Sequence, residues 1–127
     1  MLSFNYICSI CHRKYDISPK LMLCPSCSKQ QILGQPLKGV LEVELNGTLN
    51  SDDPLDFLPV EKHYFPSIPV GNTPMWYPKS HSEKLGLKKL YFKDDGVNPT
   101  GSLKDRASFL VSAFACKHNI KEIVVAS

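Results

Sequence analysis

The chain has 127 residues, of which 43% are hydrophobic and 21% charged, and its formal net charge is +3. This composition is typical of a soluble globular protein and excludes a disordered one, and the charge is too small to indicate nucleic-acid binding by itself. No apolar run approaches the ~20 residues that span a membrane, and the N-terminus lacks the basic and apolar regions of a secretory signal. We therefore expect a cytoplasmic, reducing location, no membrane association, and cysteines that are free thiols or metal thiolates.

Two cysteine pairs stand near the N-terminus. Cys8-x-x-Cys11 and Cys24-x-x-Cys27 are separated by twelve residues. Each pair can offer two thiolates from one tight turn, and two such turns complete a tetrahedral four-sulfur site. Such a site has no open position, so it predicts a structural zinc ion and not a catalytic one. We expect residues 1–37 to form a zinc ribbon, because a module of that size buries too small a core to fold unaided.

Other interpretations of the cysteines are weaker. The run from Cys8 to His12 also matches a c-type haem attachment site, but haem attachment needs export and leaves the second pair unexplained. A thioredoxin-like redox role is not favoured, because no strand–helix pattern surrounds either pair. The loop between the pairs predicts a two-stranded ribbon that turns around residues 17–19. The fifth cysteine, Cys116, is expected to be a small core residue or a semi-buried one.

Residues 38–69 are expected to form a strand and a proline-rich connector. Leu41 to Leu45 alternate between apolar and acidic residues, which predicts a half-buried strand that ends at Asn46-Gly47. The stretch 54–78 holds six of the ten prolines and predicts extended chain with little helix. Further on, Ser82 to Leu87 predict a short helix that Gly86 would end.

Residues 70–127 follow a strand, loop, helix, strand pattern. Leu90 to Phe92 predict the first strand, and Ile123 to Ala126 predict a strand of the kind that is buried in a parallel sheet. The helix between them has an apolar face of Leu103, Ala107, Leu110 and Phe114, widened by Val111 and Ala115. The pattern predicts an α/β fold built on a right-handed parallel βαβ unit.

Lys104 is the residue in this pattern that most needs an explanation. Ser102 and Asp105 have the spacing of a capping box, so the helix is expected to begin at Ser102 with Lys104 in its first turn. A cation at this positive end of the helix dipole costs roughly 0.3–1 kcal/mol, although it could be a solvated charge that Asp105 offsets. The same field favours the neutral amine, which is the form that attacks an aldehyde.

Two motifs resemble a known family. The run Asn98 to Arg106 resembles the cofactor-lysine motif of threonine synthases, and Gly71-Asn72-Thr73-Pro74 resembles the segment that opens their catalytic domain. The resemblance spans Gly71 to Ser127, and some threonine synthases share the N-terminal cysteine motif. It departs from the usual pattern at Leu103, where the family usually has Phe, and at Asp95, where it often has Glu.

The resemblance implies a fold type II pyridoxal-phosphate (PLP) enzyme. Lys104 would be the catalytic and cofactor-binding residue. Asp105 would cap the helix, and Arg106 would form a structural ion pair. The implied reaction is that of a lyase converting O-phosphohomoserine and water to threonine and phosphate, with PLP and a structural zinc as cofactors. Its partner would be this small-molecule substrate, with no nucleic acid or membrane.

The resemblance also implies that parts of the active site lie beyond Ser127. Relatives carry a phosphate-binding loop and the partner of the pyridine nitrogen in later segments. We therefore expect residues 70–127 to be the N-terminal part of a truncated catalytic domain, and the chain alone to lack activity.

Two alternatives stay open. The first is another fold type II enzyme, related to cysteine synthase, cysteate synthase or threonine dehydratase, with the same lysine and different chemistry. The second is a zinc-ribbon binding module, in which the remaining residues are only a scaffold. Its support is limited to a few basic and aromatic residues on the ribbon: Arg13, Lys14, Lys20, Lys29, Tyr6 and Tyr15.

Overall fold

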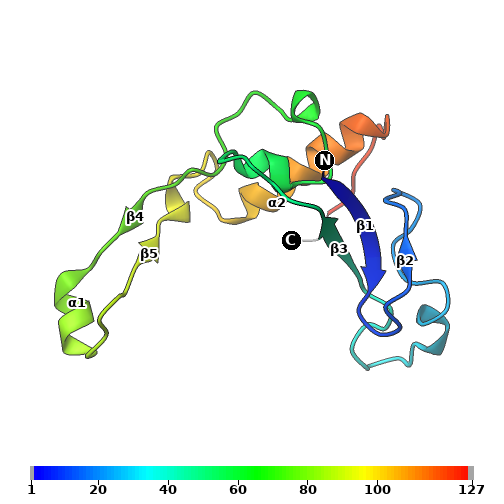
Figure 1. Ribbon diagram of the computed structural model, residues 1–127, viewed down its shortest axis with the longest axis horizontal. Helices are drawn as coiled ribbons and strands as arrows, with labels where there is room; N and C mark the ends of the chain where they lie inside the picture. Colours follow the sequence, from blue (N-terminus) through cyan, green and yellow to red (C-terminus); the bar gives the residue numbers. More distant parts are fainter. Residues whose placement is uncertain (1, 126–127) are drawn as a thin grey trace. The chain divides into compact units, whose positions relative to one another are not determined.

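A three-stranded antiparallel sheet organises the N-terminal part of the chain. In the computed structural model, which describes residues 2–125, the strand order is β2-β1-β3 (Figure 1). The strands are β1 (Ser3–Cys8), β2 (Lys14–Tyr15) and β3 (Leu41–Asn46). This sheet belongs to a unit of residues 1–63 and 118–127, and a second unit comprises residues 64–117.

The strand expected at Leu41 is confirmed, but its apolar face is not buried. β3 pairs with β1 along its whole length and is followed by Gly47, whose φ of 105° ends the strand. Val43 and Leu45 nevertheless remain 47% and 37% exposed. Glu44 is instead held by an ion pair with Lys14 on β2, at 2.6 Å. The alternation predicted that one face of this strand would pack on an apolar core. The sheet instead has an ion pair between neighbouring strands, and Val43 and Leu45 stay partly exposed.

The turn of the cysteine module lies at a different place from the one expected. β1 and β2 form a hairpin through the first cysteine pair, where the Cys8 N–H donates to the Arg13 carbonyl at 3.0 Å. His12 takes a left-handed conformation there, with φ 55°. The prediction of a ribbon turning around residues 17–19 is wrong, because the tight first cysteine turn already reverses the chain.

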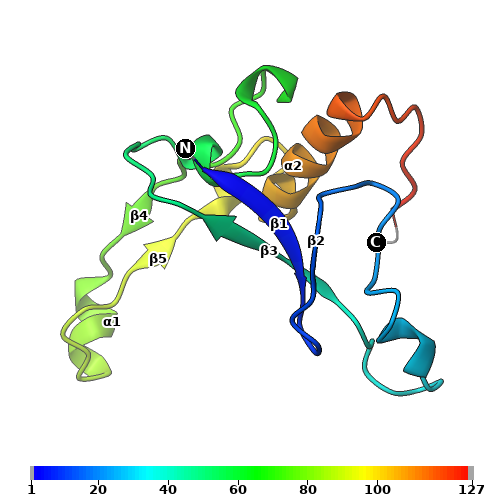
Figure 2. The same ribbon diagram turned by 45° about the vertical axis from the view of Figure 1, so that its right-hand side comes forward.

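In the second unit, two short strands form an arm. β4 (Met75–Trp76) pairs antiparallel with β5 (Phe92–Lys93), and α1 (Lys79–Lys84) lies at the far end of the arm (Figure 2). The helix expected in this region is present, but it begins three residues earlier than predicted and ends at Lys84. Gly86 closes its C-terminus with a φ of 64°, and the N–H groups of Gly86 and Leu87 donate to the carbonyls of Glu83 and Ser82.

The longer helix, α2 (Lys104–Lys117), begins two residues later than the capping box predicted. The Ser102 hydroxyl does cap it, accepting the Lys104 N–H at 3.2 Å. The carboxylate of Asp105 does not complete a capping box with Ser102. It accepts instead from the backbone N–H and the hydroxyl of Thr100, at 2.8 and 2.5 Å. The acidic residue of the motif thus closes the loop before the helix.

The buried face of α2 matches the prediction only in part. Ala115 is buried as expected, but Leu103 and Val111 are 68% and 45% exposed, and Ala113, which lies outside the predicted face, is buried. Cys116 is exposed, so its expected place in a core is wrong. Phe109 packs against Phe65 with ring centroids 4.9 Å apart. The predicted face has too few neighbours in this unit to be covered.

The parallel βαβ unit is not formed among residues 2–125. Residues 123–125 form no strand, Val124 is 97% exposed, and Ala126 lies outside the described residues. Both sheets in the described part of the chain are antiparallel. A parallel strand needs neighbouring strands on a sheet, and the short pair β4 and β5 does not provide them.

Short 3-10 turns and irregular chain make up the rest. These turns are Ser28–Gln30, Pro54–Phe57, Lys62–Tyr64 and Asp95–Val97. The connector between residues 54 and 78 accordingly contains no α-helix, as its prolines predicted. Within residues 2–125, no helix combines the length and apolar character needed to cross a bilayer.

One buried amide ties the loop before α2 to the segment at Gly71. Asn98 is only 4% exposed, and its side-chain oxygen accepts the Gly71 N–H at 3.0 Å. Its amide group donates to the carbonyls of Asp95 and Ser102, at 3.1 and 3.2 Å. None of these groups lies in an α-helix or a strand, so the side chain of Asn98 supplies hydrogen bonds that a longer element would otherwise provide.

We expect Asn98→Ala to destabilise the second unit. The substitution would leave the Gly71 N–H without its partner, and one unsatisfied group of this kind costs about 1–3 kcal/mol when it is buried. The midpoint of urea unfolding, compared with that of the unaltered chain, measures the change. An unchanged midpoint would show that water replaces the amide without cost.

Candidate functional site

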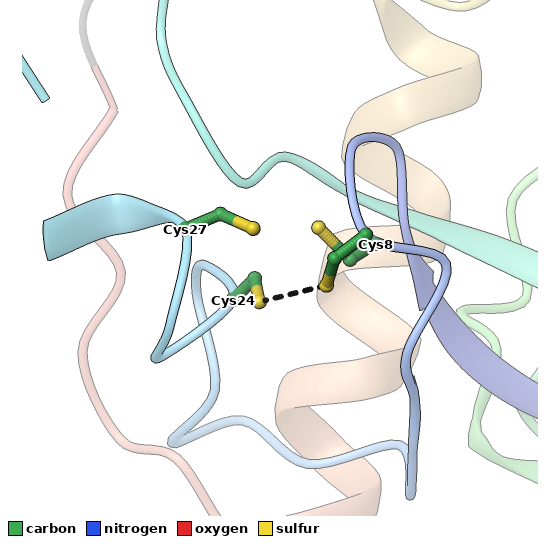
Figure 3. A group of neighbouring side chains, drawn as sticks. Cys8, Cys24 and Cys27 are labelled. Atoms are coloured by element: carbon green, nitrogen blue, oxygen red, sulfur yellow. Dashed lines mark hydrogen bonds between the residues drawn. The ribbon is translucent and has the colours of Figure 1, made fainter. Parts of the chain in front are cut away.

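The two cysteine pairs meet in one cluster. The sulfur atoms of Cys8, Cys11, Cys24 and Cys27 all lie within 4.8 Å of one another, and Figure 3 shows the thiols of Cys8, Cys24 and Cys27 pointing together. The sulfurs of Cys11 and Cys24 are 3.7 Å apart. Four sulfurs placed tetrahedrally at the ordinary zinc–sulfur bond length would be about 3.8 Å apart. The donor set and the spacing therefore fit a zinc ion.

Each cysteine pair is shaped by a backbone turn. The His12 N–H donates to the Cys8 carbonyl, and the Ser28 N–H donates to the Cys24 carbonyl, both at 3.0 Å. In the first turn the Ile10 N–H also lies 3.4 Å from the Cys8 sulfur. The left-handed position after Cys11 is occupied by His12, not by glycine. These turns aim both sulfurs of a pair to the same side of the chain.

Burial makes the electrostatics of the cluster uneven. Cys8 and Cys24 have no exposed surface, whereas Cys11 is exposed. The Tyr15 hydroxyl and the backbone N–H of Cys27 lower the pKa of Cys24 to about 6. Hydrogen bonding to Cys11, together with burial, raises the pKa of Cys27 to about 12. A metal ion would have to displace the remaining thiol protons, so its binding would release protons.

Gly39 closes the cluster from the second cysteine turn. Its carbonyl accepts the Cys24 N–H at 2.8 Å, and its φ is +78°. A Cβ atom at this position would lie 3.1 Å from the Ser28 nitrogen and 3.2 and 3.3 Å from the Cβ atoms of Cys24 and Cys27. These neighbours are backbone or the first side-chain carbon, so they cannot move aside easily. No motif in the sequence distinguishes Gly39 from the other glycines.

Lys104 is the first residue of α2, as its expected place in the first helical turn required. It is exposed, and no hydrogen bond or ion pair of its amine is found among residues 2–125. The two charged residues that follow are engaged elsewhere: Asp105 with Thr100, and Arg106 with Asp95. Of these three consecutive charged side chains, only that of Lys104 is available to a ligand.

The expected ion pair of Arg106 is confirmed, and its partner is Asp95. The guanidinium donates to both carboxylate oxygens, at 2.8 and 2.7 Å. It also donates to the Thr73 hydroxyl at 3.1 Å, and that hydroxyl donates to Asp95 at 2.6 Å. Arg106, and to a smaller extent Thr73, hold the pKa of Asp95 well below its usual range. Position 95 was noted only as a departure from the family pattern, and no sequence signal paired it with Arg106.

These contacts join the two motifs that carried the family resemblance. Thr73 belongs to the Gly71–Pro74 segment, and Arg106 belongs to the Asn98–Arg106 run. The Arg106 guanidinium also lies 3.1 Å from the place where a Cβ of Gly71 would stand. The segment at Gly71 is therefore packed against the residues around Lys104.

The chain is similar to known proteins of one family. Residues 67–127 match the family described as pyridoxal-phosphate dependent enzyme. The chain is 51% identical over 49 residues to the threonine synthase of Methanosarcina acetivorans, which covers 39% of this chain and 12% of that protein. It is 43% identical over 53 residues to the threonine synthase of Methanocaldococcus jannaschii, covering 41% of this chain and 13% of that protein. It is also 42% identical over 72 residues to the threonine synthase of Bacillus sp. (strain ULM1), and this alignment covers 56% of this chain and 20% of that protein.

The resemblance to threonine synthases is thereby confirmed. The aligned regions span only 12% to 20% of the length of these curated relatives. No solved structure shows a significant match to the chain.

We expect Gly39→Ala to weaken metal binding at the cysteine cluster at least about tenfold, the effect usual for groups that support metal ligands. The added methyl group would push the second cysteine turn away from the first. Gly34→Ala is the matched control, because Gly34 has nearly the same φ, +79°, and no atom within 4 Å of an added Cβ. Competition with a chromophoric chelator measures the affinity. Equal affinities of the two variants would contradict the steric argument.

We expect part of the stability of the second unit to disappear in acid. The pKa of Asp95 is lowered in the folded chain, so its contribution is complete above the unfolded value of about 3.9 and is lost as the pH falls through the folded value. Unfolding midpoints between neutral pH and pH 2 should therefore fall less steeply in Asp95→Asn, which should be less stable at neutral pH. Asp16→Asn, at an exposed aspartate, is the control. Parallel curves for the unaltered chain and Asp95→Asn would refute the assignment.

Proposed function

We propose that this chain is part of a threonine synthase-like, PLP-dependent lyase that converts O-phosphohomoserine and water to threonine and phosphate. The observation that carries the proposal is the position of Lys104. It stands at the start of a helix with an uncommitted amine, within residues 67–127, which match the pyridoxal-phosphate dependent enzyme family. The proposed reaction and substrate are those of a whole protein, because the aligned regions cover only 12% to 20% of the matched relatives.

Lys104 is the proposed attachment point of the cofactor. When bound, PLP supplies an electron sink that makes proton removal next to the substrate nitrogen feasible. The amine of Lys104 would hold the cofactor at rest and later carry protons at its Nζ atom. Both tasks need the neutral amine.

The residues around Lys104 would fix its orientation. Ser102 caps the first turn of α2, and Asp105 closes the preceding loop on Thr100. Arg106 anchors the same turn to Asp95 and Thr73. Because hydrogen bonds fix the residues before and after Lys104, its backbone would be held in one position and its side chain would point to the cofactor from there.

The four cysteines are the proposed ligands of a structural zinc ion. All four positions of a tetrahedral site would be filled, which leaves none for a substrate. The ion would stabilise the β1–β3 sheet, whose buried core consists mainly of the cysteines themselves with Tyr15 and Leu41 against them. We propose residues 1–37 as the metal module, residues 38–69 as the connector and residues 70–127 as part of the catalytic domain, in a cytoplasmic enzyme.

The test uses the complete gene product. Its extent is determined by sequencing the gene beyond the codon for Ser127. We expect PLP to give the visible absorption of a lysine-bound cofactor and, after borohydride reduction, a mass increase on the peptide that contains Lys104. The protein should release phosphate from O-phosphohomoserine. Lys104→Ala should lose the absorption and at least about 10³-fold in activity, whereas Lys88→Ala, at an exposed lysine, should retain both.

Two outcomes would redirect the proposal. Labelling at a different lysine would refute the role of Lys104. Labelling at Lys104 without phosphate release, but with activity on serine or cysteine derivatives, would favour another fold type II enzyme.

A further inference from the structure

One phenol contacts the cysteine cluster directly. Tyr15, at the end of β2, places its hydroxyl 3.1 Å from the sulfur of Cys24. Cys24 has no exposed surface, and Tyr15 packs against the same cluster. A buried thiolate is costly unless donors surround it, and a phenol donates more strongly than a thiol. In a metal-bound cluster the hydrogen bond would therefore run from the Tyr15 O–H to the Cys24 sulfur.

A second side chain from the same hairpin reaches the same cysteine turn. Nη1 of Arg13 donates to the hydroxyl of Ser26 at 2.9 Å, and Ser26 lies between Cys24 and Cys27. Arg13 and Tyr15 flank Lys14 at the start of β2, and the side chains of both reach the second cysteine turn. Both contacts thus connect the hairpin that starts at the first cysteine pair to the turn of the second pair.

The charge of a metal-bound cluster would make these two contacts favourable. Four thiolates with one divalent zinc ion carry a net charge of −2. The guanidinium of Arg13 brings a positive charge to this group, and the Tyr15 O–H brings a dipole to its buried sulfur. Outer groups of this kind usually orient the ligands of a metal and tune its affinity.

We propose that Tyr15 and Arg13 form an outer shell of the metal site. Tyr15 holds the Cys24 thiolate in its ligating orientation, and Arg13 fixes the second cysteine turn against the first. The inference rests on the proposed metal site and deepens it, because it identifies two positioning residues that do not contact the metal.

Tyr6 provides the matched control for Tyr15. The two tyrosines stand opposite each other in the pairing of β1 with β2. No hydrogen bond from the Tyr6 hydroxyl to a cysteine is found among residues 2–125. A Tyr→Phe change at either position keeps the ring and removes only the hydroxyl, so the two variants separate a contact to sulfur from strand packing.

The experiment loads the full 127-residue chain with cobalt(II) or zinc(II) and measures affinity by competition with a chelator. We expect Tyr15→Phe to lose about tenfold in affinity and Arg13→Ala to lose a similar factor, with Tyr6→Phe unchanged. Removing the O–H donor also raises the energy of the sulfur electrons. The sulfur-to-cobalt charge-transfer band should therefore shift to longer wavelength in Tyr15→Phe and stay in place in Tyr6→Phe.

Three results would overturn the inference. Affinity within twofold of the unaltered chain and an unshifted band in Tyr15→Phe would refute the role of Tyr15. Equal losses in Tyr6→Phe and Tyr15→Phe would assign the effect to strand packing. Failure of the unaltered chain to bind either metal would overturn the metal site itself, and the outer shell with it.

Discussion

The ion pair between Arg106 and Asp95 is the contact on which the surroundings of Lys104 depend. It joins the first turn of α2 to the loop before it, and through Thr73 it joins both to the segment at Gly71. Little apolar surface is buried in this unit, so directed polar contacts and the buried amide of Asn98 determine its local structure. The two charged residues after Lys104 are committed to polar contacts, whereas no partner of the Lys104 amine is found among residues 2–125.

The N-terminal unit follows a similar rule with different chemistry. Its buried residues include three of the four clustered cysteines, and few large apolar side chains are covered. Such a core is too small to stabilise a sheet of short strands, whereas a metal bound by four thiolates could do so. The turns at the cysteines, the close approach of Gly39 and the contacts from Tyr15 and Arg13 all act on the geometry of that one cluster.

The sequence allowed local features to be predicted where one residue type has a strong conformational or chemical preference. The cysteine spacing predicted the cluster, Gly86 the end of α1, and the alternation from Leu41 a strand. Periodicity alone could not decide whether residues 123–126 form a parallel strand. Strand formation depends on neighbouring strands, and residues 2–125 do not supply them. The partnership of Arg106 with Asp95 and Thr73 was also hidden, since it joins residues that are far apart in the chain.

The central claim is that the polar contacts around Asp95 and Arg106 present Lys104 to a cofactor. The most direct measurement is a crystal structure of the complete gene product grown with PLP. The account predicts continuous density between the Lys104 side chain and the cofactor, with Arg106 still paired to Asp95 and Thr73. Cofactor bound at another lysine, or Lys104 paired with a carboxylate away from the cofactor, would contradict it.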